Sequence, residues 1–370
     1  MIMKNLISLI FKAIASVFIV CIAIKSIANQ NSNDDLNASK QSTANTVNIT
    51  NSPKAVQTKG APTINDWLVR IHDASRRRAY TGTFVVTVGA DMASARIWHV
   101  CDGDQQMERV ETLTGSPRST FRHNNNVVTF FAEAKVARSE QREALGIFPN
   151  FLRSNDSAIA EFYNLKTLES ERVAGVDADV VQLVAKDALR YSYRIWTERK
   201  SGLVVKLQTL DVTGRVIEQA AFSELNLEAP VKIDRLLAMM NNTAGHKLEQ
   251  VNMVKTTALA QGWALQRSVP GFASMSCFKR PVQLEAVSSG TSTQEVDKVG
   301  TMQWIFSDGL ATVSLFVEPF DRKRHNQEGA WSMGATQTLA KRLDDWWLTA
   351  VGEVPAPTLK VFAQQLERRK

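Results

Sequence analysis

Apolar and polar residues alternate in short runs along much of the chain, which predicts strands covered on one face. In the run Thr83–Val88, for example, Phe84, Val86 and Val88 fall on one side and polar or small residues on the other. Further runs predict strands at Ala95–Val100, Met107–Leu113, Val127–Phe131, Asp179–Ala185, Arg190–Glu198, Leu203–Leu210 and Val216–Leu225. Glycine-containing turns separate the last of these runs, as in an antiparallel meander. We therefore expect a curved antiparallel sheet.

Helical spacing replaces this alternation at two places in the first region. Thr63 can cap a helix, with Asp66 three residues later, after which apolar residues recur on one helical face. Between residues 139 and 166 the alternation stops, a proline interrupts the chain, and residues 156–165 have a helical pattern. We expect this insertion to lie across the sheet as short helices.

A second set of strands follows in the last third of the chain. Thr301–Phe306 and Leu310–Val317 flank Asp308-Gly309, which predicts a hairpin with a type I′ turn. Further strands are expected at Thr336–Ala340 and Trp346–Val351, and a helix follows Pro355. The pattern as a whole predicts an α+β protein with a large sheet domain and a small domain closed by a helix.

The ends and the breaks of the pattern divide the chain into five segments. Residues 1–28 have a cationic start, an apolar run and small residues before Ala28, which predicts a signal peptide cleaved after Ala28. An uncleaved anchor is the alternative. Residues 29–61 are polar and predict a disordered leader. The remaining segments are a first domain at 62–228, a linker at 229–247 and a second domain at 248–370.

The charge of the chain excludes one class of partner. Loss of residues 1–28 removes three lysines and no acid, so the formal charge falls from +7 to +4. The basic residues are spread among acids instead of clustering with aromatic residues, which argues against nucleic-acid binding. The balance suits an acidic partner or an anionic envelope surface.

No motif of a common enzyme class occurs in the sequence. The five histidines form no H-x-x-x-H or H-E-x-x-H pair, and the G-x-S-x-G and phosphate-binding loops are missing. We therefore expect a non-catalytic protein with no metal and no cofactor; the alternative is a hydrolase whose site is assembled from distant residues. Cys101 and Cys277 would remain after cleavage, and their spacing is compatible with a disulfide or with two free thiols.

The apolar residues of the sheet could line a cavity for an acyl chain, because open barrels shelter such ligands on an apolar inner face. The candidate wall residues are Phe84, Val86, Phe130, Tyr191, Tyr193 and Leu207 on strands, and Phe148, Phe151 and Leu152 on the insertion. The alternative is that these residues fill an ordinary core.

Six short motifs occur in the order found in a known family. Those in the first region are Arg190–Trp196, Gly202-Leu203-Val204 and Gly214–Gln219. Those in the second region are Val269-Pro270-Gly271-Phe272, Ser307-Asp308-Gly309-Leu310 and Val351-Gly352-Glu353-Val354-Pro355. With Trp67-Leu68 near the start, they resemble the RseB/MucB family over the chain from about Trp67 to the final helix. The polar leader and Cys101 fall outside this pattern.

The resemblance implies both a fold and a function. The fold is a large domain like the lipoprotein carriers LolA and LolB, a half-open antiparallel β-barrel with plugging helices, joined to a small α/β C-terminal domain. The function is negative regulation of the sigma-E (AlgU-type) envelope stress sigma factor, in the periplasm. Such a protein binds the periplasmic domain of a membrane-spanning anti-sigma factor of RseA/MucA type and protects it from regulated proteolysis. Lipid-type stress ligands such as lipopolysaccharide or lipoprotein acyl chains release it.

A periplasmic lipoprotein or lipid carrier of LolA type is the alternative, although it has no obvious use for the second domain. We therefore predict that the small domain and the linker supply most of the contact with the anti-sigma factor. The candidate partner-binding residues are Phe306, Asp308, Phe316, Arg322 and Arg324. Self-association is left open by the sequence.

Overall fold

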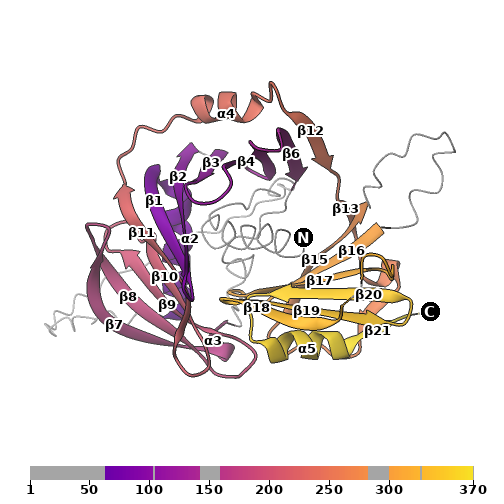
Figure 1. The fold of residues 1–370 in the computed structure, drawn as a ribbon. Helices are drawn as coiled ribbons and strands as arrows, with labels where there is room; N and C mark the ends of the chain where they lie inside the picture. The colour runs from indigo at the N-terminus through magenta and orange to yellow at the C-terminus, as the bar shows by residue number, and fades with distance from the viewer. Residues whose placement is uncertain (1–62, 103–104, 142–158, 282–299, 326, 370) are drawn as a thin grey trace, which may run out of the picture.

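The computed structural model describes residues 63–102, 105–141, 159–281, 300–325 and 327–369, which form two β-sheet domains (Figure 1). In this described part of the chain, no helix is both long enough and apolar enough to cross a bilayer. The predicted signal peptide and leader lie outside the described residues, as do Phe148, Phe151 and Leu152 of the insertion.

The first domain is built on one curved sheet of twelve strands. In chain order they are β1 (Tyr80–Val88), β2 (Asp91–Asp102), β3 (Gln105–Thr112), β4 (Arg118–His123), β5 (Asn126–Phe131), β6 (Val136–Gln141), β7 (Tyr163–Val173), β8 (Val176–Ala185), β9 (Ser192–Glu198), β10 (Val204–Leu210), β11 (Val216–Asn226) and β12 (Lys247–Val251). Their order across the sheet is β12-β6-β5-β4-β3-β2-β1-β11-β10-β9-β8-β7. Neighbours are antiparallel except β12 and β6, which are parallel. With β12 and β7 at its two edges, the sheet forms an open arc (Figure 1).

Three helices accompany this sheet: α2 (Ile64–Arg77), α3 (Ile159–Phe162) and α4 (Ile233–Asn241). The start of α2 has the predicted capping box, because Asp66 N donates to Thr63 Oγ1 (3.2 Å) and Thr63 N donates to the Asp66 carboxylate (2.8 Å). The buried face of α2 packs with residues of β8 and β9. The helix α4 lies on the outer side of the arc, over β2 to β4 (Figure 1).

The second domain has a sheet of seven strands in the order β13-β15-β16-β17-β20-β19-β18 and a small sheet of β14 and β21. The strands are β13 (Val254–Thr256), β14 (Trp263–Leu265), β15 (Ala273–Pro281), β16 (Gly300–Ser307), β17 (Thr312–Pro319), β18 (Gly329–Met333), β19 (Thr336–Leu343), β20 (Trp346–Gly352) and β21 (Leu366–Arg368). A short 3-10 helix, η2 (Leu259–Gln261), and α5 (Ala356–Gln365) complete it. From α5, Leu359 and Phe362 enter the core of this domain.

The predicted linker, residues 229–247, packs on the first domain as well as connecting the two domains. The helix α4 packs on the large sheet, and β12 adds to its edge strand β6, where Arg138 and Glu249 form an ion pair at 3.0 Å. Residues 248–251, expected in the second domain, therefore pair with the first. The chain passes from one sheet to the other between β12 and β13.

Two local predictions also differ from the structure. Residues 156–158 of the helix expected at 156–165 lie outside the described residues. Of the rest, Ile159–Phe162 form the single turn α3, and the chain from Tyr163 onward is a strand that pairs with β8. The hairpin around Asp308-Gly309 is not a two-residue type I′ turn, since Ser307 pairs with Thr312 and leaves four residues in the loop. Gly309 has a φ of 99°, whereas Asp308 is not among the residues with positive φ.

Candidate functional site: the interface between the two domains

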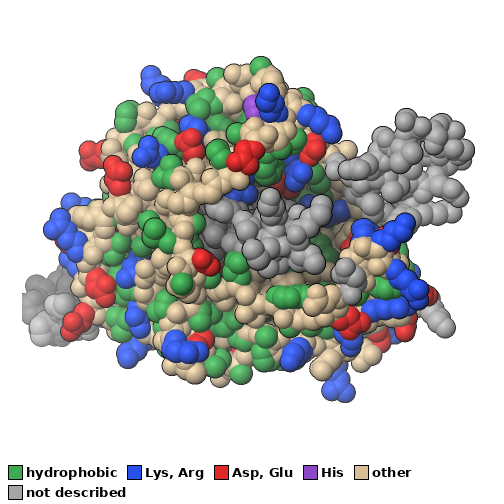
Figure 2. All heavy atoms as spheres, viewed as in Figure 1, with side chains coloured by type: hydrophobic (Ala, Val, Ile, Leu, Met, Phe, Trp, Pro, Cys, Tyr) green, Lys and Arg blue, Asp and Glu red, His purple; other side chains and the backbone are tan. Residues whose placement is uncertain are grey.

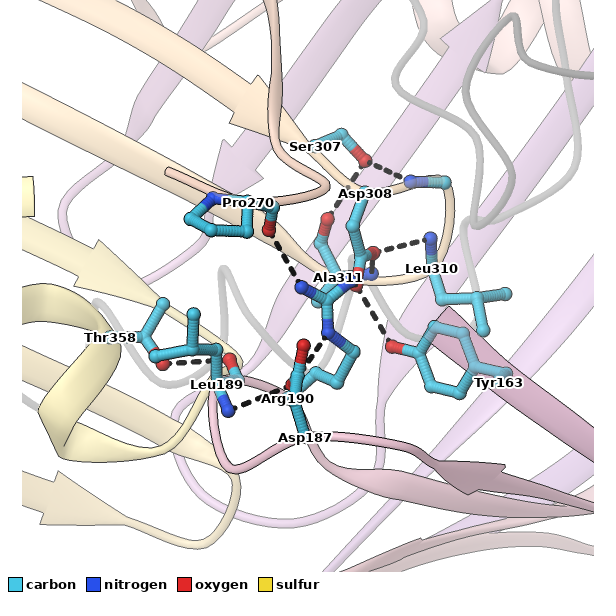
Figure 3. A network of polar contacts seen from close by, with 11 residues as sticks. Tyr163, Asp187, Leu189, Arg190, Pro270, Ser307, Asp308, Leu310, Ala311 and Thr358 are labelled. Carbon is cyan, nitrogen blue, oxygen red and sulfur yellow. Dashed lines mark hydrogen bonds and ion pairs between the residues drawn. The ribbon is translucent and has the colours of Figure 1, made fainter. Parts of the chain in front are cut away.

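A buried arginine joins the two domains through their loops (Figure 3). Arg190 lies two residues before β9, and its side chain has 0% of its surface exposed. Its Nη1 donates to Asp308 Oδ2 (3.1 Å) and its Nη2 to the carbonyl of Pro270 (2.7 Å), both in the second domain. Its Nε donates to Asp187 Oδ1 (3.0 Å) in the first domain. One cation therefore binds acceptors on both sides of the interface.

Asp308 is the second buried charge of this network. Its Oδ1 accepts hydrogen bonds from the backbone N–H groups of Leu310 (2.9 Å) and Ala311 (2.7 Å). Its Oδ2 accepts from the Tyr163 hydroxyl (2.9 Å) as well as from Arg190. Burial raises the pKa of the Asp308 carboxyl, and these donors and the guanidinium oppose that shift. The buried Asp308 carboxylate is thus stabilised only while Tyr163 and Arg190 of the first domain donate to it.

Two aromatic rings and a glycine pack closely against the Arg190 guanidinium. Its carbon lies 4.2 Å from the ring centre of Phe162 and 5.2 Å from that of Phe272, so aromatic faces from both domains stack on it. Gly271 has a φ of 78°, and a Cβ at this position would lie 2.7 Å from Arg190 Nη1. A glycine is required here by the backbone conformation and by the arginine.

Two further hydrogen bonds flank this network. Thr358 Oγ1 on α5 donates to the carbonyl of Leu189 (2.7 Å), and Gln337 Nε2 on β19 donates to the Tyr191 hydroxyl (3.3 Å). The residues on either side of Arg190 are therefore also held by the second domain.

Two carboxyl groups with raised pKa values, those of Glu218 and Glu353, lie at the interface. Glu218 on β11 accepts a hydrogen bond from the backbone N–H of Ala335 (3.2 Å), which precedes β19. Burial raises the pKa of Glu218, and burial together with the charge of Glu218 raises the pKa of Glu353 to about 8. Glu353 therefore carries a proton near neutral pH, and its ionisation would place two negative charges at one site.

The motifs on which the family resemblance rests meet at this interface. Five of the six contribute to it, through Arg190 and Tyr191, Glu218, Pro270 and Gly271, Asp308, and Glu353. These segments are far apart in the sequence, and each would have a purely local explanation by itself. Together they supply many of the contacts that hold the two domains to each other.

The candidate cavity residues are distributed among three clusters of buried side chains. Phe84 and Val86 belong to a cluster with Ile97 and Phe222, whereas Tyr191, Tyr193 and Leu207 belong to the cluster beneath α2. That these two groups face a ligand stays a prediction.

Phe130 was wrongly assigned to the same wall. It packs in a third cluster under α4, edge-on to Phe121 with ring centres 5.7 Å apart, and also against His246 at 5.2 Å. Because α4 was predicted as part of a linker, the face of the sheet that it covers could not be anticipated.

The candidate partner-binding residues differ in how exposed their side chains are. Phe306 packs in the core of the second domain against Phe362, with ring centres 4.9 Å apart, and Asp308 is buried between the domains. Neither is accessible to an external partner in this structure. Phe316 is half-buried, and Arg322 and Arg324 are exposed.

Comparisons with known proteins identify the two domains independently. The family model described as the MucB/RseB N-terminal domain matches residues 63–240, and that of the MucB/RseB C-terminal domain matches residues 257–367. The chain is 27% identical over 317 residues to the sigma factor AlgU regulatory protein MucB of Pseudomonas aeruginosa, covering 84% of this chain and 92% of that relative. It is 25% identical over 296 residues to the sigma-E factor regulatory protein RseB of Haemophilus influenzae, covering 78% of this chain and 86% of that relative.

Solved structures agree with the fold. The crystal structure of MucB in complex with MucA(peri) superposes with a TM-score of 0.59 and 25% identity, covering 82% of this chain and 98% of that chain. The structure of MucB alone gives a TM-score of 0.56. The predicted architecture, a large open sheet with helices and a small second domain, is confirmed. Both domain models match in order over most of the chain, and the chain belongs to the MucB/RseB family.

Proposed function

We propose that this protein is a periplasmic negative regulator of a sigma-E-type (AlgU-type) envelope stress response. It binds the periplasmic domain of a membrane-spanning anti-sigma factor of RseA/MucA type and protects it from regulated proteolysis. The observation that carries this proposal is the similarity to MucB in complex with MucA(peri) over 82% of this chain and 98% of that one. The curated relatives are regulatory proteins, not enzymes, so the function requires binding surfaces and no chemistry.

The predicted signal peptide supports the location. An exported protein with a short apolar run and small residues before a cleavage position reaches the compartment in which the anti-sigma factor exposes its periplasmic domain. Lipid-type ligands, lipopolysaccharide or lipoprotein acyl chains, would release the regulator by favouring its unbound form, which is a linkage effect.

The second domain supplies most of the partner contact in this proposal. It distinguishes the chain from a single-domain lipid carrier, and it has exposed cations at Arg322 and Arg324 next to β17. Arg324 already pairs with Glu318 (3.3 Å) and Asp321 (3.1 Å), which leaves Arg322 as the cation better placed to meet an acidic partner.

The test is a binding titration of purified protein with the periplasmic segment of the cognate anti-sigma factor, in wild type and in Arg322→Glu. The matched control is Arg215→Glu in the first domain, whose side chain is 80% exposed. We expect Arg322→Glu to weaken binding about tenfold, with little effect of the control, because reversing a charge at a contact with the partner costs far more affinity than reversing one outside it. Equal affinities for all three proteins would remove the second-domain assignment.

A second arm of the same titration separates regulator from carrier. Added lipopolysaccharide should lower the affinity for the anti-sigma segment, and the segment should survive longer in the presence of its protease when the regulator is bound. Lipid binding without any anti-sigma binding would leave the LolA-type carrier as the better account.

A further inference from the structure

A cysteine, a histidine and a glutamate lie together on the first domain, outside the interface. His99 and Cys101 are two residues apart on β2, so their side chains share one face of the strand, and Glu108 on β3 is directly opposite His99. The alternate residues Val100 and Met107 face α4. The three polar residues therefore occupy the other face of the sheet, away from that helix.

The three side chains are aligned for proton transfer. The distance from Cys101 Sγ to His99 Nε2 is 3.0 Å, and that from His99 Nδ1 to Glu108 Oε1 is also 3.0 Å. The carboxylate accepts the Nδ1 proton, which leaves Nε2 to exchange a proton with the thiol. A nucleophile, a base and a group that orients the base form the arrangement that activates cysteine nucleophiles.

The environment keeps this arrangement intact. His99 has 0% and Glu108 1% of the side chain exposed, and the ring of Tyr80 on β1 stacks on His99 with ring centres 4.9 Å apart. Burial lowers the pKa of His99, but the hydrogen bonds to Cys101 and Glu108 outweigh it and raise this pKa to about 9. The imidazole is therefore protonated at neutral pH, next to the sulfur.

One further charged residue lies beside Glu108 on the neighbouring strand. Arg122 on β4 lies opposite Glu108, and the second oxygen of Glu108 is buried without a hydrogen-bond partner among the described residues. No group of three histidine, cysteine or acidic residues in the described part of the chain is arranged to hold a metal ion.

The other described cysteine provides a contrast within the same molecule. Cys277 is buried in the core of the second domain, where burial raises the pKa of its thiol to about 11. Cys101 is partly exposed, and both are free thiols. Only Cys101 combines access with an adjacent imidazole.

We propose that Cys101 is a site of reversible thiol modification, at which low-molecular-weight disulfides form a mixed disulfide with the protein. The Cys101 thiolate attacks one sulfur of the small disulfide, the new protein S–S bond forms, the old S–S bond breaks, and the other half leaves as a thiolate that takes up a proton. A small thiol reverses the step. His99 and Glu108 act as positioning residues that hold a charged imidazole beside the sulfur.

The experiment treats the folded full chain with oxidised glutathione and, separately, with iodoacetamide between pH 5 and 9. Mass spectrometry of the cysteine peptides follows each site. We expect the glutathione adduct on Cys101 and none on Cys277 over the same time. At pH 6, alkylation of Cys101 should exceed that of free glutathione by about tenfold or more, because the charged His99 imidazole lies 3.0 Å from the reacting sulfur.

Two variants test the role of the neighbours. Glu108→Gln keeps the shape and an acceptor but removes the charge, and His99→Asn removes the base. Each should shift the pH profile of Cys101 alkylation upward and slow the reaction at pH 6 by about tenfold; the melting temperature reports whether each variant is folded. The proposal is overturned if wild-type Cys101 at pH 6 reacts no faster than glutathione, or if Glu108→Gln leaves the profile unchanged.

Discussion

Replacement of Arg190 by methionine removes the cation that joins the two domains and leaves Asp308 buried without it. Methionine keeps much of the apolar stem, so the change isolates the charged head group. The structure assigns three hydrogen bonds to this head group, at 3.0, 3.1 and 2.7 Å. Loss of one partner of a buried ion pair costs about 3 to 5 kcal/mol, because the remaining charge is left uncompensated.

The exposed pair Arg215–Asp211 provides a matched control. Its charged atoms are 2.9 Å apart, as close as those of the buried pair, but the Arg215 side chain is 80% exposed. Arg215→Met should therefore change the free energy of unfolding by no more than about 1 kcal/mol. The comparison separates burial from the mere presence of an ion pair.

The assay is urea unfolding followed by tryptophan fluorescence, combined with small-angle scattering in the absence of denaturant. We expect Arg190→Met to lower the midpoint or to enlarge the radius of gyration as the domains separate. A loss of about 3 kcal/mol corresponds to more than a hundredfold change in the docking equilibrium, since about 1.4 kcal/mol is a factor of ten. Arg190→Met that behaves like Arg215→Met would refute the role of the buried pair.

A double-mutant cycle sharpens this test. In Asp308→Asn the side-chain oxygen still accepts from the backbone of Leu310 and Ala311, while the charge is lost. If the two charges interact, the double variant Arg190→Met/Asp308→Asn should be less destabilised than the sum of the single changes. Strict additivity would show that the residues act separately.

Two further predictions concern the same interface. Gly271→Ala should weaken domain docking without altering either core. The alanine Cβ would lie 2.7 Å from Arg190 Nη1, and the φ of 78° at this position is unfavourable for alanine. Limited proteolysis between β12 and β13 would detect the loosened domains. The pKa of Glu353 is raised from an ordinary value of 4.5 to about 8, so the folded protein binds more protons than the unfolded chain between these values. The contribution of the Glu353 proton to stability is then complete below about pH 4.5 and is lost as the pH rises through 8. The free energy of unfolding should therefore fall from pH 5.5 to 8.5, and Glu353→Gln should flatten this dependence.

The parts of the fold that could be predicted are those with local causes. The capping box at Thr63 and Asp66 involves residues three apart, and β1 alternates in both sequence and burial. The strand β4 was missed because Arg118–His123 carries polar residues on both faces and has no alternation to detect. The strand β7 was missed because its pairing with β8, and not its own pattern, decides its conformation.

The interface could not be predicted for a different reason. Arg190 and Asp308 are 118 residues apart, and each has a sufficient local explanation. Asp308 precedes a glycine, which is ordinary turn chemistry, and Arg190 begins the strand predicted at Arg190–Glu198. A hint was present in the motifs, since they contain charged and glycine residues as well as apolar ones. Without the fold, nothing in the sequence indicates that these residues face one another.

The composition of the interface suits a protein that must change state. Each domain has its own apolar core, and Leu189 and Ala335 pack across the interface. The contacts between the domains also include one buried ion pair and one pair of carboxyl groups. An apolar interface loses stability gradually as its area is exposed. A buried ion pair is stable only while both charges are in contact. A ligand that pulls Arg190 from Asp308 would therefore favour full separation over partial opening. If the anti-sigma factor contacts both domains, this separation would release it, and the affinity of Arg190→Met for the anti-sigma segment should fall together with domain docking.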